Sequence, residues 1–72
     1  MAENDRAALL AELERLEEQE RDVSLVRRRL HERIDRGFPN ESLLAEERRV
    51  SAERRELHAR IDVLRARIEL LN

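Results

Sequence analysis

Two sets of polar residues with identical spacing are the features of this 72-residue chain that can do chemistry. Each set contains, in order, a glutamate, a serine, an arginine, a histidine and an aspartate. The first set is Glu20, Ser24, Arg27, His31 and Asp35, and the second is Glu47, Ser51, Arg54, His58 and Asp62. Because arginine presents a planar fork of donors that matches a phosphate group, the repeated arginines favour a phosphorylated ligand.

The two sets lie within a longer repeat, which is offset by 27 positions along the chain. Residues 20–35 and 47–62 share eleven of their sixteen positions. The shared valine, leucine and isoleucine follow from helix packing alone. The shared polar residues have no packing reason to recur at the same spacing, so we interpret them as the functional part of the repeat.

Apolar residues at alternating steps of four and three predict two coiled-coil helices. The predicted seam consists of Leu9, Leu13, Leu16, Glu20, Val23, Arg27, Leu30 and Ile34 in the first half, and of Leu43, Glu47, Val50, Arg54, Leu57, Ile61, Leu64, Ile68 and Leu71 in the second. At about 100° per residue, the five polar residues of each set fall in a narrow stripe along one edge of the seam. The helices therefore position the polar sets side by side.

A short break separates the two helices. Gly37 suits the left-handed position that ends the first helix, and Asn40, which follows Pro39, is a suitable N-cap for the second. Such a short connection makes the helices antiparallel neighbours. We expect an all-α, antiparallel two-helix coiled-coil hairpin.

The hairpin is expected to form one domain over residues 1–72. Its helices are predicted near residues 5–36 and 41–71, joined by a loop at 37–40.

Matching the two seams places Arg27 opposite Arg54 and relates the polar sets by a pseudo-two-fold axis. At a separation of about 7 Å and an effective dielectric near 20, the two arginines repel by about 2 kcal/mol. A phosphorylated ligand between them, or internal ion pairs with Glu20, Glu47, Asp35 and Asp62, would relieve this repulsion.

Composition excludes several classes of protein. The chain has no cysteine and one aromatic residue, carries a net charge of −2, and all 15 of its basic residues are arginine, which a GC-rich genome would also explain. Without cysteine, disulfides and thiolate zinc sites are unavailable. The sequence has no apolar stretch of the roughly 20 residues that a membrane span needs, so we expect a cytoplasmic protein that does not bind membranes. Negative charge and few aromatics argue against direct DNA or RNA binding.

The spacing of the polar sets resembles the cyclic-di-GMP signature of the RsiG family of bacterial anti-sigma factors, which control WhiG-type sigma factors. The family has glutamine at the fourth place of the signature, where this chain has His31 and His58. The resemblance implies an antiparallel coiled coil that binds a dimer of cyclic-di-GMP, and it makes a WhiG-type sigma factor the expected partner. Nucleotide binding carries over more directly than sigma-factor control, because we expect no additional segment before the first long helix, where larger family members have extra sequence that could help to hold a sigma factor.

The resemblance also implies roles for the residues. Arg27 and Arg54 would bind phosphate oxygens and stack on guanine, and the carboxylates of both sets would accept hydrogen bonds from guanine N–H groups. Ser24 and Ser51 would let the nucleotide approach the helices. His31 and His58 would donate to the nucleotide or stack on it in place of the family's glutamine.

Other interpretations remain open at this point. The chain could be a structural coiled-coil dimerisation module with no nucleotide ligand. We expect no enzyme activity, because His31 and His58 lie on long helices without a nucleophile, and no metal site, although His31, His58, Asp35 and Glu47 are possible ligands.

A core this small needs further stabilisation, so we expect a homo-oligomer, a dimer of hairpins forming a four-helix bundle. Small residues on the outer face of the second helix, Ala45, Ala52, Ala59 and Ala66, would allow another helix to approach. The sequence does not decide whether the two motifs of one site come from one chain or from two.

Overall fold

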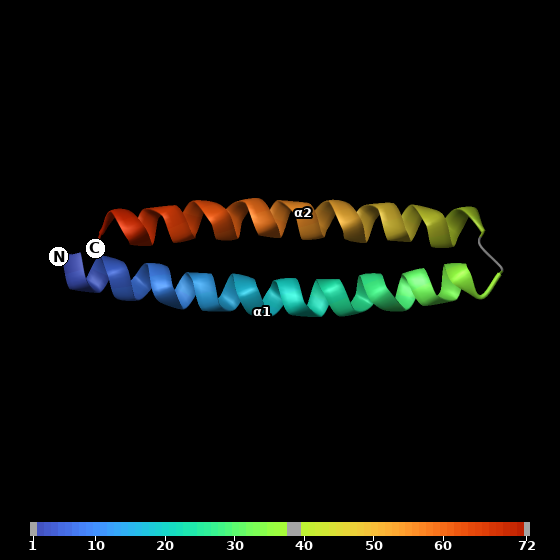
Figure 1. Ribbon diagram of the computed structural model, residues 1–72, viewed down its shortest axis with the longest axis horizontal. Helices are drawn as coiled ribbons and strands as arrows, with labels where there is room; N and C mark the ends of the chain where they lie inside the picture. The colour runs from blue at the N-terminus through green and yellow to red at the C-terminus, as the bar shows by residue number, and fades with distance from the viewer. Residues whose placement is uncertain (1, 38–39, 72) are drawn as a thin grey trace.

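A computed structural model describes residues 2–37 and 40–71 of the chain. It contains two long helices, α1 (Ala2–Asp35) and α2 (Glu41–Leu70), which pack against each other along their whole length. The helices run in opposite directions, so that the first turns of α1 lie beside the last turns of α2 (Figure 1). The predicted all-α, antiparallel hairpin is confirmed.

The ends of the helices follow the local chemistry of the sequence. Gly37 has a φ of 103°, a conformation that side chains with a Cβ rarely adopt, and its N–H donates to the carbonyl of Ile34 at 3.2 Å. The Asn40 side chain accepts from the N–H of Leu43 at 2.8 Å, as an N-cap does. Both terminal signals read from the sequence are confirmed.

The observed helix limits differ little from the predicted ones. α1 begins at Ala2 instead of near residue 5 and ends at Asp35, and α2 begins at Glu41 as expected. Its last helical residue is Leu70, followed by the turn residue Leu71. In the predicted loop, Phe38 and Pro39 lie outside the described residues.

The core is the apolar part of the seam between the helices. One cluster, nearer the chain ends, contains Leu16, Leu57, Ile61 and Leu64, and a second, nearer the loop, contains Leu30, Leu43 and Val50. Val23 packs against both clusters. These contacts agree with the register predicted from the sequence. Leu71 is the exception: it was predicted in the seam but lies beyond the end of α2 with 42 % of its surface exposed.

The polar seam residues separate the two clusters. Arg54 lies between Val50 of the loop-side cluster and Leu57 of the other, and Arg27 occupies the matching place between Val23 and Leu30. The fold thus consists of a rod of 54 × 14 × 14 Å with an interrupted apolar seam. Neither helix has, over its described residues, the apolar length that a membrane crossing requires.

Candidate functional site

The backbone places the polar residues of both helices along one flank of the seam. Ser24 and Ser51 each directly follow a valine of the seam, and His31 and His58 each directly follow a leucine. A step of one residue turns a helix by about 100°. All four side chains therefore stand on the same side of their respective apolar rows, at the boundary between the core and solvent. We call this boundary the polar flank.

One half of the polar network joins Glu20 and Ser24 of α1 to Arg54 and His58 of α2. Ser24 Oγ donates to Glu20 Oε1 at 2.6 Å, one helical turn away. Arg54 Nε donates to Ser24 Oγ at 3.0 Å, and His58 Nε2 lies 2.9 Å from Glu20 Oε1. The serine hydroxyl thus accepts from the facing helix while it donates within its own helix.

The other half repeats these contacts with the helices exchanged. Ser51 Oγ donates to Glu47 Oε1 at 2.6 Å, and Arg27 Nε donates to Ser51 Oγ at 3.0 Å. His31 Nε2 lies 2.9 Å from Glu47 Oε1. Each half takes its glutamate and serine from one helix and its arginine and histidine from the other. The pseudo-two-fold relation predicted from the repeat is present in the side-chain contacts.

The arginines find counter-charges within the hairpin. Arg54 Nε lies 3.5 Å from Glu20 Oε1, so one of the internal ion pairs left open by the sequence is present. Arg27 makes no ion pair among the described residues, although its charge helps to lower the pKa of Glu47. Arg54 can pair with Glu20 because Glu20 lies one helical turn before Ser24, to which Arg54 donates.

The network leaves several polar atoms without partners among the described residues. Both arginines donate through Nε alone, and their terminal Nη atoms make no hydrogen bond there. Glu20 and Glu47 receive their contacts at Oε1, which leaves Oε2 free. The open donors and acceptors lie next to each other in each half.

The last residue of each polar set does not join the network. Asp35 and Asp62 are exposed and make no side-chain hydrogen bond or ion pair within the described part of the chain. Internal pairing of the arginines with these aspartates, one of the alternatives open from the sequence, is therefore not observed. The structure brings together eight of the ten predicted residues and leaves the two aspartates one turn beyond the histidines.

The glutamates are held in their ionised form. The Ser24 hydroxyl lowers the pKa of Glu20 from its ordinary value of 4.5; burial opposes this effect, and His58 and the charge of Arg54 reinforce it. The Ser51 hydroxyl, followed by His31, likewise lowers the pKa of Glu47. A hydroxyl that donates to a carboxylate stabilises the charged form. Both carboxylates are consequently acceptors at neutral pH.

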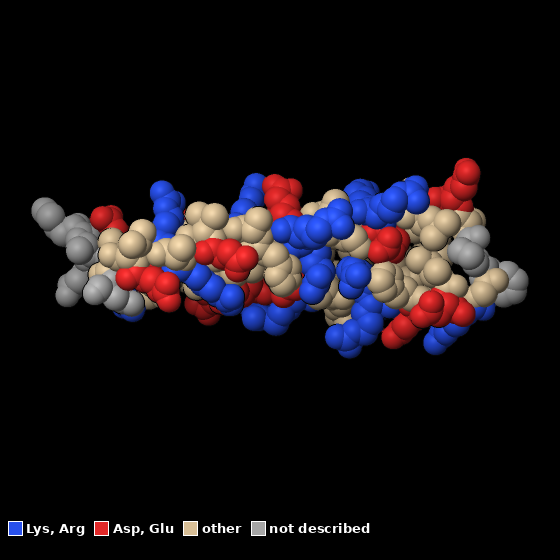
Figure 2. Space-filling model, turned by 45° about the horizontal axis from the view of Figure 1, so that its top comes forward, with Lys and Arg blue, Asp and Glu red and all other residues tan. Residues whose placement is uncertain are grey.

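A shallow groove opens beside one half of the network. Its walls are formed by Arg27, Glu47, Arg48, Ser51 and Arg55. Basic side chains gather around the middle of the face seen in Figure 2, between acidic side chains nearer the two ends. Arg48 and Arg55 are not among the residues predicted from the repeat. Each directly follows a polar residue of the seam, and this position could have predicted that they lie beside the site.

Among the residues that the structure describes, the side chains of the site contact one another through hydrogen bonds and an ion pair. No group of three or more histidine and acidic side chains there could hold a metal ion. The two serines donate to carboxylates and accept from arginines, and neither contacts a histidine. The arrangement is suited to binding a ligand that offers acceptors to the arginines and donors to the carboxylates.

Comparisons of the chain with protein-family models, curated proteins and solved structures find no match.

We predict that acid weakens the hairpin through the two glutamates. Because the pKa of each is lower in the folded than in the unfolded chain, their stabilisation is complete above the ordinary value of 4.5 and is lost as the pH falls through the folded-state pKa. Melting temperatures measured from about pH 5 to pH 3 should fall less in the double variant Glu20→Gln, Glu47→Gln than in the unmodified protein.

Glu18→Gln is the matched control for this prediction, because Glu18 is exposed and makes no side-chain contact of this kind in the described region. It should keep the acid dependence of the unmodified protein. If the double variant lost stability with acid as steeply as the control, the network would contribute nothing to the pH response.

Proposed function

We propose that this protein is a signalling protein that binds cyclic-di-GMP on its polar flank, as its resemblance to the RsiG family implies. The observation that carries the proposal is the pair of equivalent arginines, each fixed by a serine at Nε with its Nη atoms unpaired in the described structure. An arginine oriented in this way presents donors to a phosphate without first having to be ordered. The two halves of the site are therefore already formed before the ligand binds.

The symmetry of the network supports a ligand that has two-fold symmetry itself. Cyclic-di-GMP contains two guanosine units and two phosphates, and two stacked molecules preserve such symmetry. The repeated contacts at 2.6, 2.9 and 3.0 Å give the two halves of the site equivalent geometry. Either half can then contact an equivalent part of the ligand.

Guanine is the base that fits the free acceptors. Its N1–H and N2–H₂ groups are donors, and a carboxylate accepts from both at once. Oε2 of each glutamate and the exposed carboxylates of Asp35 and Asp62 are free to accept them. A phosphate alone would leave these acceptors unused, so the site favours a guanine nucleotide over a simple anion.

His31 and His58 occupy the place of the family's glutamine, and both contact a glutamate of the facing helix. Their side chains are 42 % and 48 % exposed, so a nucleotide can reach them. We assign them a dual role: in the free hairpin each histidine orients a glutamate, and in the complex its exposed ring stacks on or donates to the nucleotide.

A structural coiled-coil module is the alternative function that a specific observation favours. The ion pair between Arg54 and Glu20 and the two histidine–glutamate contacts link the helices without any ligand. In that case the polar network would fix the register of the helices, a known role of polar groups in coiled-coil seams. The two functions differ in what happens when nucleotide is added.

We predict that calorimetry will detect cyclic-di-GMP binding with a Kd of about 1 µM or tighter and roughly two nucleotides per site; a Kd of 1 µM corresponds to about 8 kcal/mol. GTP and cyclic-di-AMP are the controls, because GTP lacks the cyclic two-fold frame and adenine lacks the N1–H and N2–H₂ donors. Absence of heat at millimolar cyclic-di-GMP would reject nucleotide binding and leave the structural module.

We predict that Arg27→Ala and Arg54→Ala each weaken nucleotide binding by tenfold or more, as expected when a charged hydrogen bond of about 1.5–3 kcal/mol is lost. Arg27→Lys should also bind weakly, because lysine keeps the charge but lacks the fork. The free energy of unfolding of the ligand-free alanine variants should change by less than about 1 kcal/mol, because a partly exposed ion pair such as that of Arg54 contributes little and Arg27 makes a single hydrogen bond in the described structure.

Arg29→Ala is the matched control, since Arg29 is an exposed neighbour without a partner among the described residues. It should bind as the unmodified protein does. Severe unfolding of both Arg27→Ala and Arg54→Ala would instead assign the arginines to the structural module.

Control of a WhiG-type sigma factor is the second part of the proposal, and it rests on the resemblance alone. We expect the hairpin to bind a purified sigma factor of this type in the presence of cyclic-di-GMP and much more weakly without it. A fluorescence-anisotropy titration of the labelled hairpin measures both affinities. Equal affinity with and without nucleotide, or no binding in either case, would contradict this role.

A further inference from the structure

The hairpin has a second flank, on the side of the seam opposite the polar network. The polar flank contains residues that directly follow a valine or leucine of the seam. The second flank contains residues that directly precede a seam residue, such as Glu12, Arg60 and Arg67. Because one residue turns a helix by about 100°, these two kinds of position lie on opposite sides of the apolar row. The second flank has no part in the proposed nucleotide site.

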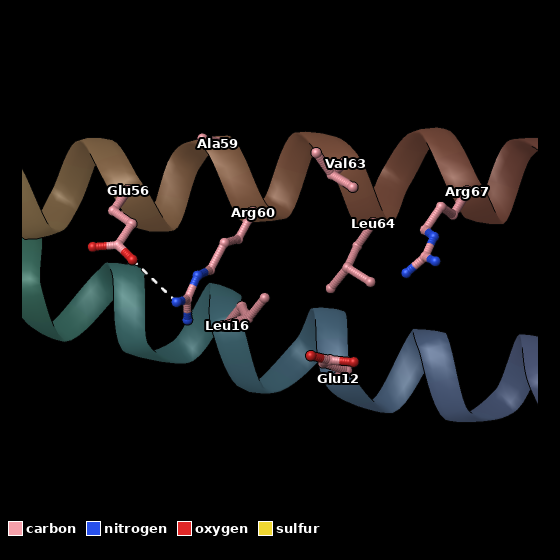
Figure 3. A pocket seen from close by; sticks show the side chains of 8 residues that line it. All are labelled: Glu12, Leu16, Glu56, Ala59, Arg60, Val63, Leu64 and Arg67. Carbon is pink, nitrogen blue, oxygen red and sulfur yellow. Dashed lines mark hydrogen bonds and ion pairs between the residues drawn. The ribbon is translucent and has the colours of Figure 1, made fainter.

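Shallow grooves follow this second flank on both sides of its middle. The groove shown in Figure 3 has Leu16 of α1 and Leu64 of α2 pointing toward each other, with Arg60 and Arg67 reaching from α2 toward α1. A neighbouring groove nearer the chain ends is lined by Asp5, Ala8, Leu9, Glu12, Arg67, Leu70 and Leu71. A third, nearer the loop, is lined by Asp22, Val23, Val26, Glu46, Arg49, Val50 and Glu53.

Large apolar side chains are exposed along these grooves. Val63 is 58 % exposed, Leu70 86 %, and Val26 and Leu71 42 % each. The grooves also expose the edges of the core itself, because Leu16, Leu64 and Val50 line them. Contiguous apolar surface of this kind, rimmed by charges, is typical of a protein interface.

Both positive and negative side chains border the grooves, so a partner surface that also carries both signs would complement them. Near the chain ends the grooves carry both signs, with Glu12 on α1 and Arg67 on α2 shared by the two grooves. Neither of these residues has a hydrogen bond or ion pair within the described part of the chain. In a two-fold arrangement each copy can offer its arginine to the glutamate of the other. A partner with one sign of charge would leave half of the rim unmatched.

The size of the flank also suits a second copy. A rod 54 Å long and 14 Å wide presents roughly 750 Å² on one side, close to the ~800 Å² per partner of a standard interface. The free hairpin exposes 5811 Å², compared with about 4,700 Å² for a compact chain of this mass, and none of the described side chains is less than 2 % exposed. Pairing through the second flank would supply the missing core.

We infer that a second copy of this chain packs on the second flank, so that two hairpins form a four-helix bundle with the polar flanks of both copies facing outward. The inference does not depend on the proposed function, because the bundle forms without nucleotide. It also places the association on the grooves around Val63 and Leu70, where Ala59 is the one residue of the alanine stripe on α2 that lines them. Each bundle would then carry two nucleotide sites.

The test is the mass of the full chain in solution, measured by sedimentation equilibrium without nucleotide. The unmodified protein should approach twice its chain mass of 8.6 kDa as its concentration rises. Val63→Glu should shift the midpoint of dimerisation at least tenfold toward higher concentration, because it places a charge in the apolar groove. Circular dichroism establishes whether each variant remains helical.

Leu25→Glu is the matched control, since Leu25 is 41 % exposed but lines none of the grooves described on the second flank. It should dimerise as the unmodified protein does, and so should Arg54→Ala. A monomer at every concentration tested would overturn the inference and leave the flank to a helix of another protein. A helical Val63→Glu variant that dimerises as strongly as the control would also overturn it.

Discussion

The geometry of the polar flank depends on the hydrogen bond that each seam arginine donates to a serine of the facing helix. Arg27 and Arg54 occupy one layer of a seam that is apolar apart from these arginines and Glu20 and Glu47, and in this layer they repel each other and lose hydration. The contacts to Ser51 and Ser24 hold each guanidinium at Nε, and the glutamate beyond each serine supplies negative charge. The register of the hairpin and the geometry of the candidate site follow from the same pair of contacts.

Because of this dual role, the same contacts support both a binding function and a structural function. The contacts that fix the register also orient the free Nη and Oε2 atoms that the proposed ligand would use. A site built on rigid helices needs little rearrangement to bind its ligand. The unpaired atoms distinguish the binding function from the structural one. The exposed carboxylates of Asp35 and Asp62 contact nothing in the described hairpin, so a purely structural network does not require them.

Most of the fold could be predicted from the sequence because its determinants are local. The alternating seam, the glycine at a positive φ and the asparagine cap each act within a few residues, and all three agree with the structure. The side-chain partners could not be predicted in the same way. The repeat indicated that Glu20 and Arg54 belong to one site, but whether the glutamate neutralises the arginine depends on rotamers set across two helices. The exposure of Leu71 likewise depends on where the last turn of α2 ends, which periodicity defines only to within a few residues.

The interrupted core gives the hairpin two unequal halves that meet at Val23. Leucines in place of the arginine layer would give a more uniform apolar seam, because Leu16, Leu30 and Leu57 already pack in this way on either side of it. With the polar layer present, the two continuous helices are joined at this point by the packing of Val23 and by the hydrogen bonds of the polar network. A ligand bound across this layer would contact both helices between the two apolar clusters. Separation of the helices at the loop end would then be coupled to their separation at the terminal end.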